Sequence, residues 1–272
     1  MGAIIMSRNE SRERAAREFQ AANPGTSYTR ALRQVSRGGQ RRPLLAVLGT
    51  GSDGASVSVN LEWESEGGSG PHCLIAGAEV PALLAVLAAG LASGQRAGDL
   101  ELVLCAGEAT QLTVEHRRVG ADELVGHVDD VLRSRHEFLR SVEARDVVQA
   151  RERGHQVPTT VVLIEDLDGQ WGASAAVGRW LRIGRSSGVN VVLGAPAASP
   201  SIWADDMSPA HVVDRLARAA LAGDAAFMNA TTAAIFGLGD GRATLRTLGR
   251  WNPVRRVREA DTLSDFTFAA PQ

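Results

Sequence analysis

The stretch that most constrains this fold is GPHCLIAGAEVPALLAVLAAGLASG, residues 70–94. It runs from a short apolar segment, through Gly77, directly into a second apolar segment that predicts a helix over residues 80–93. A strand that turns through glycine into a helix has the shape of a phosphate-binding loop, in which backbone N–H groups at the helix start face an anion. The segment therefore raises the question of whether a nucleotide site is present here.

Strand-like and helix-like segments alternate over most of the chain. Strands are predicted at residues 44–50, 56–63, 72–77, 100–107, 159–166 and 189–196. Helices are predicted at 80–93, over much of 114–154 with a break near residue 144, and at 173–188. Most of these strands are apolar throughout, which indicates an α/β fold whose parallel sheet is covered on both faces. Near the end of the chain, GRATLRTLG and PVRRVREA together predict a hairpin at the edge of the sheet.

The loop after Gly77 lacks the groups that a working phosphate-binding loop uses. In the pattern G-x-x-x-x-G-K-[ST], glycines let the backbone curl around phosphate, lysine neutralises it, and the hydroxyl holds Mg²⁺. Counted from Gly77, the last three positions are Ala82, Leu83 and Leu84, and the whole chain contains no lysine. Pro81 removes one N–H of the cradle, and Val80 disfavours positive φ. The degenerate loop thus comprises Gly77, Ala78, Glu79, Val80, Pro81, Ala82, Leu83 and Leu84, and we expect both leucines to pack in the core.

Two acids, Glu165 and Asp166, end the strand predicted at 159–166. At this place P-loop enzymes keep one carboxylate associated with Mg²⁺ and one that polarises water, usually in the order Asp then Glu, which is reversed here. Acids at the end of a strand are also common as the solvated start of a loop. Both interpretations stay open at the level of sequence.

Charge is distributed unevenly along the chain. Residues 1–42 hold nine arginines and three glutamates, a charge of +6, so the remaining 20 arginines and 28 acids give −8 and the whole chain −2. Within this leader, residues 26–37 predict a basic helix with a narrow apolar stripe of Tyr28, Ala31, Leu32 and Val35. We expect either a solvated arm that docks by the stripe, or a basic arm that contacts nucleic acid, an anionic membrane or an acidic partner.

Other features limit the class of protein. The longest uncharged apolar run, residues 80–92, is shorter than the roughly 20 residues of a membrane span. The N-terminal residues lack the apolar core of a signal peptide, so we expect a cytoplasmic protein. Cys73 and Cys105 lie in apolar strand-like runs, which predicts buried, reduced thiols. His72 has no histidine or cysteine at ligand spacing except Cys73, so no metal site is predicted.

The order of these segments resembles the FtsK/SpoIIIE family of motor ATPases, and in particular the ATPase modules of EccC, the type VII secretion motor. The family has GPHxLIAGxTGSGKS, LxLVLVDFKGG, RxxLLRxxGxxDIxxYN, hhhhDEF and GRxxGIHLhLATQRP. This chain has, in the same order, GPHCLIAG, LELVLCAG, RSRHEFLRSVEARDVVQARERG, TTVVLIEDLDGQW and GRWLRIGRSSGVNVVLGAP. The resemblance covers residues 43–258. It implies a RecA-like P-loop NTPase fold of three layers with a mostly parallel sheet and edge hairpins, a helical leader at 1–42 and a tail at 259–272.

The departures from the family fall on its chemistry. The family's DFKGG is replaced by Ala106, Gly107, Glu108 and Ala109, and the segment that replaces ATQRP, residues 194–198, lacks its glutamine. What survives is the segment before the first strand, residues 70–72, and GRSSG at 184–188. In the family an arginine in this region lies near the subunit interface, which implies that Arg185 would act in trans on a partner's nucleotide. An arginine that satisfies the last carbonyls of a helix explains Arg185 equally well.

These features together predict a catalytically degenerate protein of the FtsK/EccC type. Such a protein would not be an active enzyme and would take no cofactor. It would serve as a protein-binding or regulatory subunit of a translocation or secretion motor, in a homo- or hetero-oligomer. Its partner would be an active ring ATPase or a secreted substrate. One alternative is an FtsK-type DNA translocase subunit, which would need ATP and Mg²⁺, and another is a nucleic-acid-binding module that uses the basic leader.

Overall fold

A computed structural model describes residues 43–62, 68–167, 171, 174–196, 233–247, 251–252, 257–258 and 262–269, together with Arg17 and residues 27–29. Within these residues, no helix is both long enough and apolar enough to cross a membrane. Almost all of the leader, and with it most of the predicted apolar stripe, lies outside the described residues.

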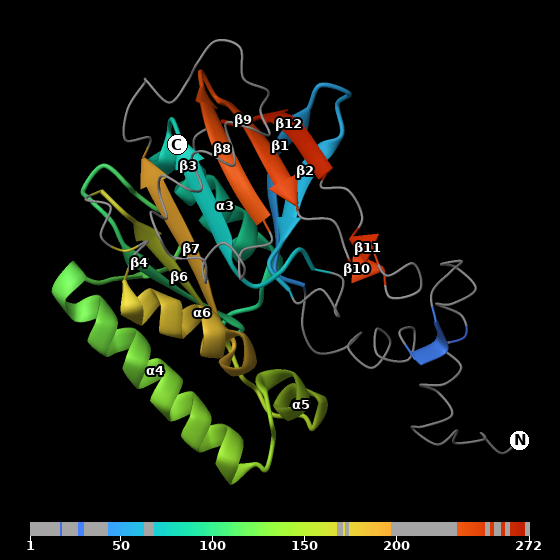
Figure 1. The fold of residues 1–272 in the computed structure, drawn as a ribbon, viewed down its shortest axis with the longest axis vertical. Coiled ribbons are helices and arrows are strands. Elements are labelled where there is room, and N and C mark those ends of the chain that lie inside the picture. Colours follow the sequence, from blue (N-terminus) through green and yellow to red (C-terminus); the bar gives the residue numbers. More distant parts are fainter. Residues whose placement is uncertain are drawn as a thin grey trace, which may run out of the picture.

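In the described part of the chain, ten strands form one mixed sheet in the order β2-β1-β12-β9-β8-β3-β7-β6-β4-β5. The strands from β8 to β5 are all parallel, so their carboxyl ends meet at one edge of the sheet (Figure 1). They are β8 (Ala233–Gly239), β3 (Cys73–Gly77), β7 (Val189–Pro196), β6 (Thr159–Glu165), β4 (Leu100–Cys105) and β5 (Arg117–Arg118). Every residue of β3 and β6 is buried, as expected for strands covered on both faces. The predicted α/β fold with a mostly parallel sheet is confirmed.

The other end of the sheet is antiparallel. It consists of β9 (Arg242–Thr247), β12 (Thr262–Thr267), β1 (Leu45–Gly51) and β2 (Ser56–Asn60). β1 and β2 form a hairpin around the turn GSDG, residues 51–54, and β2 is the outermost strand on this side. This end of the sheet therefore carries an edge hairpin.

The prediction of a hairpin between GRATLRTLG and PVRRVREA is wrong. β9 lies inside the sheet between β8 and β12, and the later segment contributes β11 (Val257–Arg258), which pairs with β10 (Trp251–Asn252) in a separate two-stranded sheet. β9 pairs with β8 on one side and with β12 on the other. β12 lies within the segment expected to be a tail. Ala243 and Phe266, which oppose each other on β9 and β12, are both buried in the core. That burial explains why residues 262–267 take the place beside β9.

Helices cover the two faces of the sheet and make three layers. α3 (Val80–Gly94) packs on one face, whereas α4 (Ala121–Ser141) and α6 (Ala175–Ser187) pack on the other (Figure 1). The break predicted near residue 144 separates α4 from the short α5 (Val147–Glu152). Asp146 caps α5, since its side chain accepts a hydrogen bond from the Gln149 N–H.

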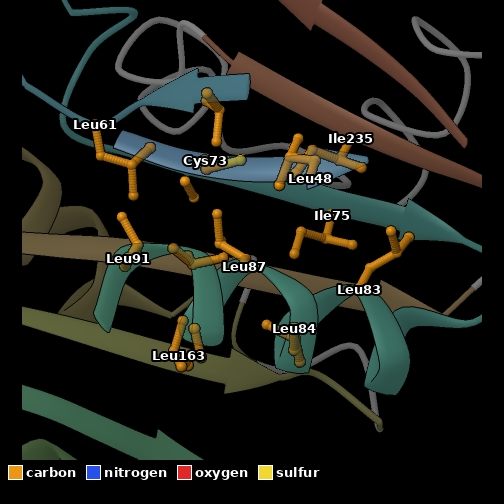
Figure 2. Close-up of a cluster of buried hydrophobic side chains, with 14 of the residues drawn as sticks. Leu48, Leu61, Cys73, Ile75, Leu83, Leu84, Leu87, Leu91, Leu163 and Ile235 are labelled. Carbon is orange, nitrogen blue, oxygen red and sulfur yellow. The ribbon is translucent and has the colours of Figure 1, made fainter. Parts of the chain in front are cut away.

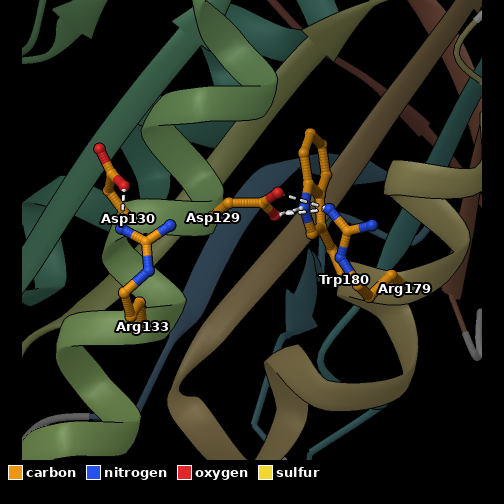
Figure 3. A network of polar contacts seen from close by, with 5 residues as sticks. All are labelled: Asp129, Asp130, Arg133, Arg179 and Trp180. Atoms are coloured by element: carbon orange, nitrogen blue, oxygen red, sulfur yellow. Dashed lines mark hydrogen bonds and ion pairs between the residues drawn. The ribbon is translucent and has the colours of Figure 1, made fainter.

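An ion pair joins the two helices of the second layer. Asp129 on α4 accepts hydrogen bonds from the Arg179 guanidinium over 2.7 Å and from the Trp180 indole N–H over 2.9 Å (Figure 3). Burial opposes ionisation of Asp129, but the hydrogen bonds from Arg179 and Trp180 outweigh it and lower the pKa of this carboxyl. The ion pair therefore fixes α6 against α4, and the fully buried Trp180 side chain packs α6 into the core.

The core between α3 and the sheet is built from leucines. Leu83, Leu84, Leu87 and Leu91 are all fully buried and lie among side chains of the neighbouring strands (Figure 2). Gly90 allows β1 to cross the helix closely, because a Cβ on this glycine would lie 2.9 Å from the Ala46 Cβ. The burial of Leu83 and Leu84 agrees with the expectation that both residues are core.

Candidate functional site at the carboxyl edge of the parallel strands

The loop from β3 to α3 is very short. β3 ends at Gly77 and α3 begins at Val80, so only Ala78 and Glu79 lie between strand and helix. Gly77 has φ 94° and Glu79, the N-cap residue, has φ 59°, so two of the three residues at the turn adopt left-handed conformations. A phosphate-binding loop needs four residues between its two glycines before the helix begins. The chain here enters the helix before it can curl around an anion.

The end of β8 and the turn from β8 to β9 lie against this loop and take up its hydrogen-bonding groups. The Ala78 N–H donates to the Gly237 carbonyl over 3.0 Å, and the Gly241 N–H donates to Glu79 Oε2 over 3.1 Å. The approach is so close that a Cβ on Gly237 would overlap the Ala78 carbonyl. An N–H that would face phosphate in a cradle therefore faces a neighbouring strand.

The first turn of α3 is filled with apolar side chains. Val80 lies over Gly194 of β7, where an added Cβ would come within 2.6 Å of Val80 Cγ1. Leu83 and Leu84 point into the core between α3 and the sheet (Figure 2). Pro81 and Ala82 are half-buried on the same turn. The positions that hold a glycine, a lysine and a hydroxyl in the P-loop pattern thus carry packing contacts here.

Glu165, at the end of β6, is buried and holds the loop that follows β4. Its Oε2 atom accepts hydrogen bonds from the Gly107 N–H over 3.1 Å and from the Thr110 hydroxyl over 2.8 Å. Arg118 holds the same loop from the other side, because its guanidinium donates to the carbonyls of Ala106, Gly107 and Thr110. Glu165 and Arg118 do not bond to each other but share this loop as a common partner. Hydrogen bonds to the loop thus account for the buried position of Glu165.

Asp166 holds the loop that follows β6 by hydrogen bonds. Its side chain is buried and accepts a hydrogen bond from the Trp171 N–H over 3.1 Å, and its own N–H donates to the Gly194 carbonyl over 2.7 Å. The two acids therefore fix the loops after β4 and β6. Because β7 lies between β3 and β6, Glu165 and Asp166 share the sheet edge with the β3–α3 loop.

Carboxylates dominate the described part of this edge. Glu79, Glu108, Glu165 and Asp166 follow the carboxyl ends of β3, β4 and β6, whereas the guanidinium of Arg118 is bonded to backbone carbonyls. A bound phosphate would bring further negative charge next to these groups, which Coulomb repulsion disfavours. Among the described residues, no group of histidine, cysteine and acidic side chains has a geometry that could hold a metal ion.

Arg185 lies away from this edge. It belongs to the last turn of α6, just before the start of β7, and so sits at the amino end of the parallel strands. The helix ends at Gly188 with φ 69°, and Gly184 lets α6 approach the next strand, since an added Cβ would lie 2.5 Å from the Val189 carbonyl. The segment GRSSG therefore has a clear packing role. The structure does not bring Arg185 together with Glu165, Asp166 or the β3–α3 loop within one chain.

His72 ties β3 to the two elements beside it. Its Nδ1 atom accepts a hydrogen bond from the Val191 N–H over 3.0 Å, and its Nε2–H donates to the Leu181 carbonyl over 3.2 Å. This pattern needs the neutral ring with the proton on Nε2. Burial lowers the pKa of His72 to about 4, and the charge of Arg185 acts in the same direction. His72 thus has a structural role.

Cys73 and Cys105 are both free and buried, as predicted. Burial raises the pKa of the Cys73 thiol to about 12 and raises the pKa of Cys105 as well. Neither thiol is therefore a reactive thiolate near neutral pH.

Sequence reasoning missed the residues that close the edge. Gly237 and Gly241 occupy the segment GLGDG, whose repeated glycines indicate a tight turn but not the loop that it covers. Thr110 and Arg118 also escaped notice, because their partners are backbone groups of a loop with no regular pattern. The one available signal was the absence of DFKGG after the strand at residues 100–105, which showed that the loop had changed.

No family profile matches the sequence, and no curated protein matches it. Solved structures do resemble the fold. The cytoplasmic domain of the type VII secretion ATPase EccC from Thermomonospora curvata has a TM-score of 0.59 at 20% identity, with 85% of this chain and 29% of that chain covered. ATPases 2 and 3 of the same EccC, in complex with a signal sequence peptide, have a TM-score of 0.52 at 13% identity over 85% of this chain and 41% of that chain.

The conjugation coupling protein TcpA of pCW3, in a monomer form with ATPγS, has a TM-score of 0.52 at 13% identity over 84% of this chain and 66% of that chain. This chain is thus shorter than each of these proteins and covers only part of their length. At these identities the likeness concerns the fold alone. The fold is that of the RecA-like P-loop ATPase domains of EccC, with helices on both faces of a mostly parallel sheet.

Proposed function

We propose that this chain is a catalytically degenerate ATPase-fold protein of the FtsK/EccC type, which acts as a protein-binding or regulatory subunit of a translocation or secretion motor. The observation that carries this proposal is the closed β3–α3 loop. The loop holds two residues between strand and helix, its Ala78 N–H is bonded to Gly237, and its expected lysine position is the buried Leu83. Each feature alone would weaken phosphate binding, and together they leave no cradle.

The acids at the sheet edge support the same conclusion. Glu165 and Asp166 stand where a P-loop enzyme would hold Mg²⁺ and polarise water, but their oxygens accept hydrogen bonds from Gly107, Thr110 and Trp171. These bonds stabilise the two loops. The fold is therefore kept while the groups that surround a nucleotide serve its packing, which favours a role as a structural or regulatory subunit.

A protein partner fits this role better than a small molecule. The solved EccC fragment with ATPases 2 and 3 was obtained with a signal sequence peptide. By analogy, this chain would bind either a secreted substrate or an active ring ATPase, on the cytoplasmic side of the membrane. Under this proposal Arg185, which is exposed at the amino end of the strands, would face a neighbouring subunit.

Calorimetry and thermal melting with Mg·ATP test the proposal. We expect no heat of binding and no change in the melting midpoint, because the cradle is absent. A Kd tighter than roughly 100 μM would add about 2 kcal/mol of stability at ~30-fold excess ligand and raise the midpoint by about 4–8 °C. Magnesium tripolyphosphate is the control, since an equal response to it would indicate attraction of any polyanion to the basic leader. A response specific to ATP would overturn the proposal in favour of a nucleotide-binding translocase subunit.

A further inference from the structure

β2 forms one end of the sheet, and half of its backbone groups face away from the sheet. In an antiparallel pair, residues whose N–H and C=O groups face the partner alternate with residues whose groups face outward. The Gly51 N–H donates to the Ala55 carbonyl and the Leu61 N–H donates to the Leu44 carbonyl, which directs the odd-numbered residues of this segment toward β1. The even-numbered residues present their backbone groups outward; they are Ser56, Ser58 and Asn60.

One of these outward groups shows how the edge is used within the chain. The Ser69 N–H donates to the Asn60 carbonyl over 2.7 Å, so the chain itself closes the edge at the end of β2. Within the described residues, the outward N–H and C=O groups of Ser56 and Ser58 meet no such partner. The open part of the edge therefore covers these two residues.

The open part also lacks the usual protection of a sheet edge. Proteins guard an exposed edge with charged side chains, with proline or with a bulge that twists it away. The sequence of β2 is SVSVN, without charge or proline, and the irregularity of the hairpin falls on β1 between Val47 and Gly49. The edge is thus regular and uncharged.

Exposed apolar side chains lie next to this edge. Val47 is opposite Ser58 and Leu45 is opposite Asn60, so these side chains share one face of the hairpin. Val47 is 52% exposed and Leu45 is 40% exposed, whereas Val59, on the other face, is fully buried. A strand placed beside β2 would direct alternate side chains to this face of the hairpin. Because the serine side chain is small, the one beside Ser58 could extend over it toward Val47.

We propose that β2 binds an extended segment of a protein partner as an additional strand, with alternate side chains lying over Ser56 and Ser58 and the apolar one at Ser58 directed toward Val47. Main-chain hydrogen bonds to the two serines would supply affinity, and the apolar side chains would supply selectivity. This inference rests on the proposed protein-binding function and names its surface. The open edge offers the backbone groups of only two residues, which suits a short extended segment better than the roughly 1,200 Å² interface of a stable dimer.

Selection from random decapeptides displayed on phage, with the full-length protein as bait, provides the probe. We expect the enriched peptides to carry apolar residues at alternate positions. Synthetic copies would then be tested by calorimetry and by hydrogen exchange. On binding, the amides of Ser56 and Ser58 should become protected, while those of Val57 and Val59, which already face β1, should change little.

The Ser58→Pro variant is the sharpest test, because it removes an outward N–H and no hydrogen bond between β1 and β2. It should weaken the enriched peptides about tenfold, whereas the matched control Ser58→Thr should leave their Kd within about twofold. Val47→Ser, which keeps every backbone group, should weaken the same peptides and serves as the second variant should proline disturb folding.

Several results would overturn the inference. They are failure to enrich alternating peptides, equal binding to Ser58→Pro and Val47→Ser, or protection at another strand. A stable dimer of the protein that Ser58→Pro abolishes would instead assign this edge to a second copy of the chain. None of these outcomes depends on nucleotide, so a failure here leaves the titration with Mg·ATP as an independent test of the proposed function.

Discussion

Leu83 occupies the position that would hold a lysine in a phosphate-binding loop, and it is fully buried. We predict that Leu83→Lys destabilises the protein, because burial of an unpaired ammonium costs several kcal/mol, about 3 or more. Chemical denaturation measures this loss. Leu83→Met is the matched control, since a swap that conserves volume costs less than about 1.5 kcal/mol. A Leu83→Lys variant that folds normally and hydrolyses ATP would show that the site lacks only its lysine.

His72 gives the stability of the protein a dependence on pH. Burial lowers its pKa from 6.5 to about 4, so the folded state favours the neutral ring more than the unfolded state does. The stabilisation is therefore fully present above pH 6.5 and is lost as the pH falls toward 4. The full loss amounts to about 3 kcal/mol.

Denaturation of His72→Asn between pH 7 and pH 4 checks this contribution. The asparagine side chain does not titrate, so its free energy of unfolding should fall less steeply with acidification than that of the unaltered protein. Parallel pH profiles for the unaltered protein and His72→Asn would contradict the assignment.

At the scale of elements, the end of β8 and the turn that follows it close the candidate site. A Cβ on Gly237 would overlap the Ala78 carbonyl, so we predict that Gly237→Ala lowers the free energy of unfolding by more than about 2 kcal/mol. Gly126 in α4 is the control, because an added Cβ there meets no atom within 4 Å. Gly126→Ala should be neutral or stabilise the helix by up to about 1 kcal/mol. Equal stability of the two variants would mean that Gly237 of β8 does not make this close contact with Ala78.

Elements were predictable where the signal is local. The helix expected at 80–93 is α3, and the strands expected near 72–77, 159–166 and 189–196 are β3, β6 and β7, because long apolar runs show buried elements directly. Pairing of the last strands was not predictable. Neighbouring segments in sequence favour a hairpin, but burial of Phe266 places β12 beside β9. The contact of Gly237 with Ala78 was not predictable either, because nothing local in either segment specifies a partner so distant along the chain.

At the scale of the whole molecule, the sheet divides into two regions with different uses. The carboxyl edge of the parallel strands is closed by its own loops and carries acids, whereas the antiparallel end finishes in an open, uncharged strand. An ATPase domain presents its ligand site at the first region. With that region closed, the surfaces that we propose for a partner are the open strand and the basic leader.

The leader carries +6 and the rest of the chain −8, and the apolar stripe predicted for it, Tyr28, Ala31, Leu32 and Val35, would be too narrow to support an isolated helix in water. It would therefore dock on its own body or on a neighbour, with modest screening by salt. We predict that deletion of residues 1–42 leaves the α/β core folded but weakens self-association or partner binding. The first described residues after the leader remain anchored in this variant, because Leu44 N–H donates to Glu62 and the Pro43 carbonyl accepts from Gln95.

Light scattering and partner pull-down at low and moderate salt measure this effect on the full-length and truncated proteins. Two variants of the full chain separate its causes. Leu32→Ser with Val35→Ser removes apolar docking, and Arg30→Gln with Arg33→Gln lowers the charge of the leader from +6 to +4, so only the second pair should weaken the salt dependence. An unchanged assembly state and unchanged partner recovery after truncation would exclude the leader from assembly. A loss of salt-dependent DNA binding on truncation would instead identify the leader as a nucleic-acid-binding arm.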